Sequence, residues 1–231
     1  IGFRQTNNNL EFSGTPVLGA TTDSLAAVLG LAAIRDDTRG KWILSTSLTG
    51  SPGSFNSRSE QEVYEENRTG ANPLYAHLYV LLQRATVLTP NLASSLRAVG
   101  QLASTNLLAS EQFAAGGDGT VRGYKDRILA GDQGYLFSHE LQYRLPSIPL
   151  GKKLPKLDLV GIAFWDYGRT LIKKTGGAKD PGQYLASCGV GLRANIANTL
   201  SASVDYGRQL EEIEIPGEPH HRIHVKVSVS Y

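Results

Sequence analysis

The sequence has little of several features that would each point to a familiar class of protein. It contains a single cysteine, Cys188, so an internal disulfide is excluded. Charged residues make up 19% of the chain, below the roughly one quarter that is usual in soluble domains. The net charge is only +2, so no strong basic field exists to attract nucleic acid, and we expect no nucleic-acid partner.

Long apolar runs are also missing. The longest, Leu25 to Ile34, is interrupted by Gly30 and falls well short of the roughly 20 apolar residues that a membrane-spanning helix needs. If the protein resides in a membrane, a closed β-barrel is the remaining structure that pairs every backbone polar group. The chain opens at Ile1 without a signal peptide, and we expect a mature product or a fragment.

The chain is instead rich in residues that alternate between apolar and polar. Near its end Ile223, Val225 and Val227 interleave with His224, Lys226 and Ser228. Successive side chains of a strand point to opposite faces, so such segments predict half-buried strands. We expect nine strands, of which the first and third alternate least clearly, at residues 22–36, 41–51, 74–88, 92–106, 133–145, 157–171, 184–195, 199–209 and 221–231.

The lengths of the connections give a second, independent indication. Connections near 36–40, 89–91, 146–156 and 195–198 are short to medium, and they alternate with longer ones at 51–73, 107–132, 172–183 and 210–220. Outer-membrane barrels have short periplasmic turns and long extracellular loops. Many of the strands also reach the roughly 9–11 residues that a tilted strand needs to cross a bilayer.

The predicted strand number is odd, whereas bacterial single-chain barrels have an even number. Open sheet edges are also unfavourable in lipid. We therefore expect further strands N-terminal to Ile1, and an all-β fold in which residues 1–231 form a partial barrel with one long loop at 107–132.

Two motifs connect the chain with a known superfamily. Gly116 and Gly117 are followed closely by Val121-Arg122-Gly123-Tyr124, and Phe164-Trp165-Asp166-Tyr167-Gly168 lies further along. The first resembles the signature loop, and the second the Phe-x-Asp-x-Gly strand motif, of the outer-membrane superfamily that includes the TpsB two-partner secretion transporters (hemolysin-activator and FhaC-like) and the BamA insertases. The second motif falls one strand later than the family pattern places it.

The resemblance covers essentially the whole chain and implies both a fold and a function. It implies that the chain is the C-terminal portion, about nine antiparallel strands, of a 16-stranded transmembrane barrel whose loop 107–132 is the signature loop. Five predicted strands follow that loop, as in the family, and the chain ends on an aromatic residue, Tyr231. The implied function is secretion of a partner exoprotein, such as a hemolysin or an adhesin, in extended form through the lumen.

The alternation within 157–171 places Trp165 and Tyr167 on the lipid-facing side, and Phe164, Asp166 and Gly168 on the lumenal side. An inward carboxylate needs a partner, and arginine can bind it through two hydrogen bonds. In the resembled family the loop arginine and the strand aspartate contact each other inside the barrel. We therefore expect Arg122 to pair with Asp166, on a turn that the glycines permit. Inward polar residues would form a hydrated wall: Arg97, Gln101, Glu140, Gln142, Arg144 and Lys226.

Other interpretations of these residues remain open. Gly116 to Thr120 resembles the nucleotide-binding motif of diacylglycerol-kinase-like enzymes, but no helix-period segment follows it. His220, His221 and His224 lie at a predicted loop-to-strand junction without a set of metal ligands, and we expect exposed histidines there. Ser, His and Asp residues show no nucleophile motif, so a barrel hydrolase lacks support, and neither a cofactor nor catalysis is expected.

The motifs alone leave the function between related alternatives. A BamA-like insertase shares the signature loop, and a passive porin shares the barrel. The segment Glu140 to Pro146 looks more like the TpsB pattern, so we expect a transporter in the bacterial outer membrane, in contact with lipid and monomeric when full length.

Overall fold

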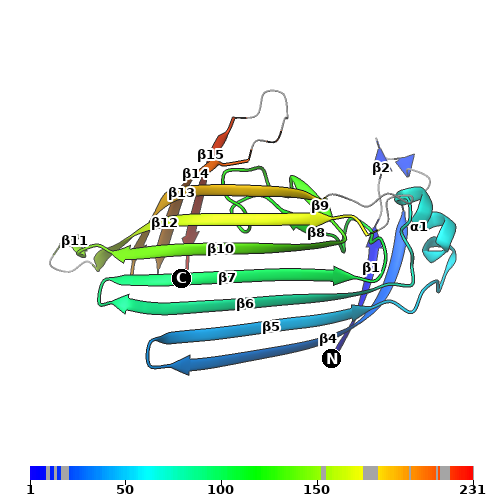
Figure 1. Cartoon of the computed structure of the whole chain (residues 1–231), viewed down its shortest axis with the longest axis horizontal. Coiled ribbons are helices and arrows are strands. Elements are labelled where there is room, and N and C mark those ends of the chain that lie inside the picture. Colours follow the sequence, from blue (N-terminus) through cyan, green and yellow to red (C-terminus); the bar gives the residue numbers. More distant parts are fainter. Residues whose placement is uncertain are drawn as a thin grey trace.

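The computed structural model describes residues 1–8, 11–12, 15–16, 21–151, 155–173, 182–197, 199–211, 213 and 219–230. Its main feature is one antiparallel sheet whose ten long strands follow one another in chain order, as Figure 1 shows. The strands are β1 (Gly2–Asn8), β4 (Thr22–Asp37), β5 (Gly40–Gly50), β6 (Ala76–Thr89), β7 (Leu92–Ala103), β10 (Gln133–Arg144), β12 (Lys156–Leu171), β13 (Gln183–Ile196), β14 (Leu200–Gln209) and β15 (His221–Val229).

Nine of these strands confirm the predicted ones, with ends that differ by no more than a few residues. The tenth, β1, was not predicted; it pairs with β4 from Gly2 opposite Val28 to Asn8 opposite Thr22. Its sequence contains one large apolar residue, Phe3, and so gives no clear alternation. Within the described residues the sheet is open, with β1 and β15 at its two edges.

The connections sort by length as expected. Two-residue turns join β4 to β5 and β6 to β7, and these turns lie at the same end of the sheet (Figure 1). The long connection at 51–75 lies at the opposite end and carries a 3-10 helix, η1 (Ser57–Ser59), and a short helix, α1 (Gln61–Asn67). The small strands are β2 (Glu11–Phe12), β3 (Thr15–Pro16), β8 (Phe113–Ala115), β9 (Leu129–Gly131) and β11 (Ile148–Pro149). The predicted terminal aromatic, Tyr231, lies outside the described residues.

The two faces of the sheet differ: apolar side chains are exposed on one and polar side chains are buried on the other, the reverse of a soluble domain. The outward face exposes large apolar side chains, among them Val190, Val204, Val225 and Val227, with exposed fractions of 59, 45, 67 and 63%. The inward face carries the buried polar and charged residues, including Asp166 and Asp205. Such an arrangement suits a sheet with lipid outside and a hydrated lumen inside. No helix in the described parts of the chain has the length and apolar character to cross a membrane.

Aromatic side chains gather on the outward face near the long-loop ends of three adjacent strands. The rings of Tyr135, Tyr167 and Tyr184 stack in sequence, with centroids 6.0 and 5.9 Å apart. At the short-turn ends lie Tyr143 and also Trp42, whose ring is 5.0 Å from the guanidinium carbon of Arg84. Two aromatic groups separated along the strands in this way are typical of the interfacial belts of a barrel.

The helix-bearing loop at 51–75 is packed against the rest of the sheet. Tyr64 on α1 is fully buried, and its hydroxyl donates to the Asp23 carbonyl at 3.0 Å. Arg68, at the end of α1, donates to both carboxylate oxygens of the fully buried Asp132, at 2.5 and 3.1 Å. Asp132 also accepts from the backbone amides of Leu107 and Lys173, each at 2.8 Å. One carboxylate therefore joins three of the long connections.

We expect the Asp132→Ala substitution to lower the free energy of unfolding of the full-length protein by about 3 kcal/mol, because it leaves Arg68 and two amides without their buried acceptor. The measurement is chemical unfolding in detergent or lipid vesicles. The matched control is Asp36→Ala, which removes an exposed carboxylate 3.7 Å from Lys41 and should cost less than about 0.5 kcal/mol. Equal effects of the two substitutions would contradict this account of Asp132.

Candidate functional site: the loop tip on the inner wall

The connection from β7 to β10 folds back onto the inner face of the sheet. It contains a hairpin, β8 paired with β9, that packs against β10 and β12. Its apolar side chains form the main buried cluster together with residues of the wall, and the cluster consists of Val99, Phe113, Ala115, Val121, Tyr124, Leu129, Leu136 and Leu185. This apolar packing fixes where the polar tip of the loop lies.

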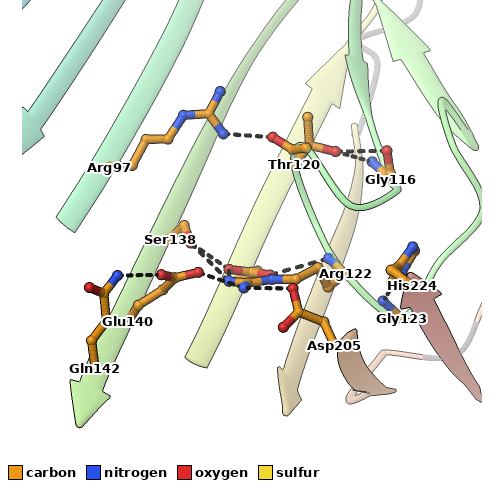
Figure 2. Close-up of polar contacts among 12 residues, drawn as sticks. Arg97, Gly116, Thr120, Arg122, Gly123, Ser138, Glu140, Gln142, Asp205 and His224 are labelled. Carbon is orange, nitrogen blue, oxygen red and sulfur yellow. Dashed lines mark hydrogen bonds and ion pairs between the residues drawn. The ribbon is translucent and has the colours of Figure 1, made fainter. Parts of the chain in front are cut away.

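Glycines shape the turn at the tip. Gly116, Gly117 and Gly123 have φ values of +111°, +94° and +90°, which only glycine adopts without strain. A Cβ on Gly117 would also lie 1.7 Å from a carboxylate oxygen of Asp126. The Thr120 hydroxyl closes the turn, since it accepts from the Gly116 amide at 2.9 Å and donates to the Gly116 carbonyl at 2.7 Å (Figure 2).

The turn directs Arg122 against β12, where it meets Asp166. The guanidinium donates from Nε to Asp166 Oδ2 at 2.7 Å and from Nη2 to Oδ1 at 2.8 Å, and the Arg122 backbone amide also donates to Oδ2 at 3.2 Å. Arg122 is 4% exposed and Asp166 is fully buried. This is a two-pronged pairing of a planar guanidinium with a carboxylate, which lysine could not reproduce.

Three further groups complete the surroundings of the guanidinium. Its Nη1 donates to Glu140 Oε1 at 2.6 Å, and Asp205 Oδ2 lies 3.7 Å from the same nitrogen (Figure 2). Its carbon lies 3.5 Å from the ring centroid of Phe164, a cation–π contact. Asp205 is itself held by Arg193 through two bonds of 2.6 and 2.7 Å. Arg122 is thus surrounded by carboxylates from three different strands.

The site keeps Arg122 charged. Burial alone would lower the pKa of Arg122, but its hydrogen bonds to Asp166 and the nearby charges of Asp166 and Glu140 outweigh burial and raise the pKa above the ordinary value. At the tip Asp118 forms an ion pair with Lys226. Burial would raise the pKa of Asp118, and the hydrogen bond and charge of Lys226 instead lower it, so this pair is also ionised at neutral pH.

Small residues on the wall let the loop approach it closely. A Cβ on Gly207 of β14 would lie 2.6 Å from the Gly123 amide nitrogen and 2.9 Å from the Arg122 carbonyl carbon. A Cβ on Gly168 would lie 2.9 Å from the Val121 side chain. The backbone of Gly123 is held on its other side, since its carbonyl accepts from Gln209 at 2.8 Å.

The last residue of the loop motif, Tyr124, fastens the tip to the rim of β13. Its side chain is fully buried, and its hydroxyl lies 2.7 Å from the Ala186 carbonyl oxygen and 2.5 Å from that of Glu211. Burial raises the pKa of Tyr124. The phenol is therefore neutral and can donate to these carbonyls.

The structure brings together most of the residues that the sequence singled out. Val121, Arg122, Gly123 and Tyr124 lie against the inner wall, and Phe164, Asp166 and Gly168 face them from β12, whereas Gly116 and Gly117 lie in the turn and touch neither Arg122 nor Asp166. Sequence reasoning assigned no partner role to Ser138, Glu140, Asp205, Gln209 or His224. The only available signal was that Ser138, Glu140, Asp205 and His224 lie at the inward positions of alternating strands.

The histidines differ from the expectation. His224 is half-buried on the inner face and accepts a hydrogen bond from the Gly123 amide at 3.2 Å, so the prediction of an exposed side chain was wrong for this residue. His220 and His221 are exposed. Across the ranges that the structure describes, no group of three or more His, Cys, Asp or Glu residues could hold a metal ion.

Below the loop tip the inner face encloses a polar cavity of about 530 Å³. Its lining includes Arg97, whose Nη1 donates to the Gly119 carbonyl at 2.6 Å, and the uncharged polar residues Ser95, Ser203, Asn195 and Ser228. Among its charged groups Asp118 pairs with Lys226, Glu140 with Arg122, and Asp205 with Arg193.

Long antiparallel strands, an apolar outward face, a polar inner face and a loop folded onto that inner face define part of a transmembrane β-barrel with an internal loop. A family model described as "Haemolysin secretion/activation protein ShlB/FhaC/HecB" matches residues 1–194. The chain belongs to this family, which confirms the predicted TpsB-type membership. It is a family of secretion and activation proteins and not of enzymes.

A solved structure, CdiB from Escherichia coli, matches with a TM-score of 0.80 at 18% sequence identity. The match covers 98% of this chain and 40% of that chain, so the chain spans less than half the length of the structure that it resembles. The likeness confirms the all-β partial barrel fold. No curated protein sequence matches the chain.

The loop approaches β14 closely at Gly207. We expect Gly207→Val to push the tip from the wall and to raise the rate of proteolysis within the loop of the folded full-length protein at least roughly tenfold, the equivalent of about 1.4 kcal/mol. Gly161→Val is the matched control, because a Cβ there has no neighbour closer than 4.0 Å. Proteolysis of the Gly207 variant at the wild-type rate would show that the tip does not depend on this contact.

Proposed function

We propose that this chain forms part of the barrel of an outer-membrane transporter that exports a partner exoprotein, in extended form, through its lumen. The observation that carries the proposal is the loop tip, which is fastened to the inner wall by Arg122 and Asp166. A loop held in this position occupies space that an exported chain would have to cross. Membership in a secretion and activation family supports the same function.

The inner wall suits an extended polypeptide as cargo. The cavity below the tip is lined by serine and asparagine side chains together with paired charges. Short hydroxyl and amide groups can exchange hydrogen bonds between water and a passing backbone, and they offer no deep apolar pocket that would retain it. Folding of the exoprotein outside the cell would supply the driving force for its export, because no nucleotide is available at the outer membrane.

The loop tip would act as the movable element. Arg122 and Asp166 hold the loop in one arrangement, and an arriving exoprotein shifts it towards another by competing for the same polar groups. The outward apolar face would contact outer-membrane lipid, and the full-length barrel would be monomeric. The exoprotein would be of the hemolysin or adhesin type. A BamA-like insertase is not favoured, because the matching family is one of secretion and activation proteins.

The test is a secretion assay in cells that lack the gene and carry the full-length protein, either wild type or Arg122→Ala. We expect the variant to secrete the exoprotein encoded beside the gene at least roughly tenfold less at normal membrane levels, since the buried Asp166 loses its partner. The matched control is Arg39→Ala, which removes an exposed arginine from the turn between β4 and β5 and should secrete within about twofold of wild type.

Two results would contradict the proposal. Normal secretion by Arg122→Ala would show that export does not depend on the pairing of the loop with the wall. If deletion of the gene depleted many outer-membrane proteins instead of trapping one exoprotein in the periplasm, the insertase alternative would replace the transporter.

A further inference from the structure

His224 takes part in holding the loop tip in a way that depends on its protonation. It lies on the inner face of β15, opposite Asp205 of β14 in the strand register. Its Nε2 is 3.2 Å from the Gly123 amide nitrogen, and Figure 2 shows the ring next to this amide. A peptide N–H can only donate, so Nε2 must accept through its lone pair. Only the neutral imidazole with its proton on Nδ1 has that lone pair, because the imidazolium donates from both nitrogens.

The amide that His224 accepts is fixed at a critical point of the loop. Gly123 follows Arg122 directly, and its carbonyl accepts from Gln209 at 2.8 Å. Gly207 leaves no space on the wall for the amide to turn aside, since a Cβ there would already lie 2.6 Å from the Gly123 nitrogen. Protonation of His224 would therefore place two donors face to face and remove the hydrogen bond that the Gly123 amide makes.

Charged and titratable groups of both signs surround His224. The loop contributes Asp118, Arg122, Tyr124, Lys125 and Asp126; β14 contributes Asp205, whose partner Arg193 lies on β13; and β15 contributes Arg222 and Lys226. Asp118 is paired with Lys226, and Asp205 accepts two bonds from Arg193. Asp118 and Asp205 are thus engaged with other cations in the docked arrangement, although Asp118 also interacts with the charge of His224.

We propose that His224 is a positioning residue that holds the loop tip only while it is neutral, so that acidification loosens the tip. Histidine is the side chain whose charge ordinarily changes between about pH 5 and pH 8. The docked tip requires the form with fewer protons, so docking is favoured at high pH over low pH. This inference rests on the proposed function, since it adds a regulation to the same loop. The docking of the loop tip itself does not require transport.

The experiment measures how often the tip leaves the wall. Val121 is fully buried against the wall, so a cysteine introduced by Val121→Cys can react with a thiol reagent only when the tip opens. The full-length protein is purified in lipid vesicles with Cys188→Ala, so that this thiol does not interfere. Labelling rates are compared at about pH 8 and about pH 5.5 for three forms: His224 unchanged, His224→Gln and His224→Ala.

Glutamine presents a carbonyl oxygen near the position of Nε2 that accepts but does not titrate, whereas alanine presents no acceptor. We expect the protein with His224 to label at the rate of His224→Gln at about pH 8, and roughly tenfold faster than His224→Gln at about pH 5.5. The His224→Ala form should label faster than His224→Gln at both pH values. The pH dependence of the reacting thiol is common to all forms and cancels in these ratios.

A ratio between the His224 and His224→Gln forms that does not change with pH would overturn the proposal, as would equal rates for His224→Gln and His224→Ala. The assay contains no exoprotein. A failure here therefore leaves the secretion result standing, and a failed secretion assay leaves this one interpretable.

Discussion

The guanidinium of Arg122 in a buried site is the interaction on which the rest of the arrangement depends. An isolated buried charge costs several kcal/mol, so such a group persists only where opposite charges and hydrogen bonds compensate it. Asp166 supplies two acceptors, Glu140 supplies a third, and the ring of Phe164 covers the face of the guanidinium. Arg122 can reach these three side chains because the glycine-rich turn and the small residues on the wall let the loop approach the wall closely.

Buried pairs of a carboxylate and a cation also occur elsewhere along the loop. Glu111, in the first third of the connection, accepts from Arg4 of β1 at 2.5 Å and lies 3.0 Å from Nε2 of His77 on β6. Burial would raise the pKa of Glu111, but these partners lower it. Asp132, where the loop returns to the sheet, accepts from Arg68. In its first third, at its tip and at its end, the loop therefore takes part in a buried ion pair with another segment, and displacing any of these parts would break such a pair.

The sequence predicted the fold more completely than it predicted the site. Nine long strands were readable because lipid outside and water inside enforce a strict alternation, as in the segment from Ile223 to Val229. Strand β1 was not readable, since Phe3 is its only large apolar residue, and α1 was hidden because Tyr64 is its only buried residue. Register across strands cannot be read from one strand, so Asp205 and His224 could not be connected with the loop tip.

Arg122 and Asp166 stabilise the protein as a pair. The most direct measurement is a double-mutant cycle on the full-length protein, in which Arg122→Ala, Asp166→Ala and the double variant are unfolded in lipid vesicles. The account predicts a coupling free energy of at least about 2 kcal/mol, because each single substitution strands a buried charge and the double one strands neither. Additive effects, with a coupling near zero, would show that the two residues act independently and would contradict the account.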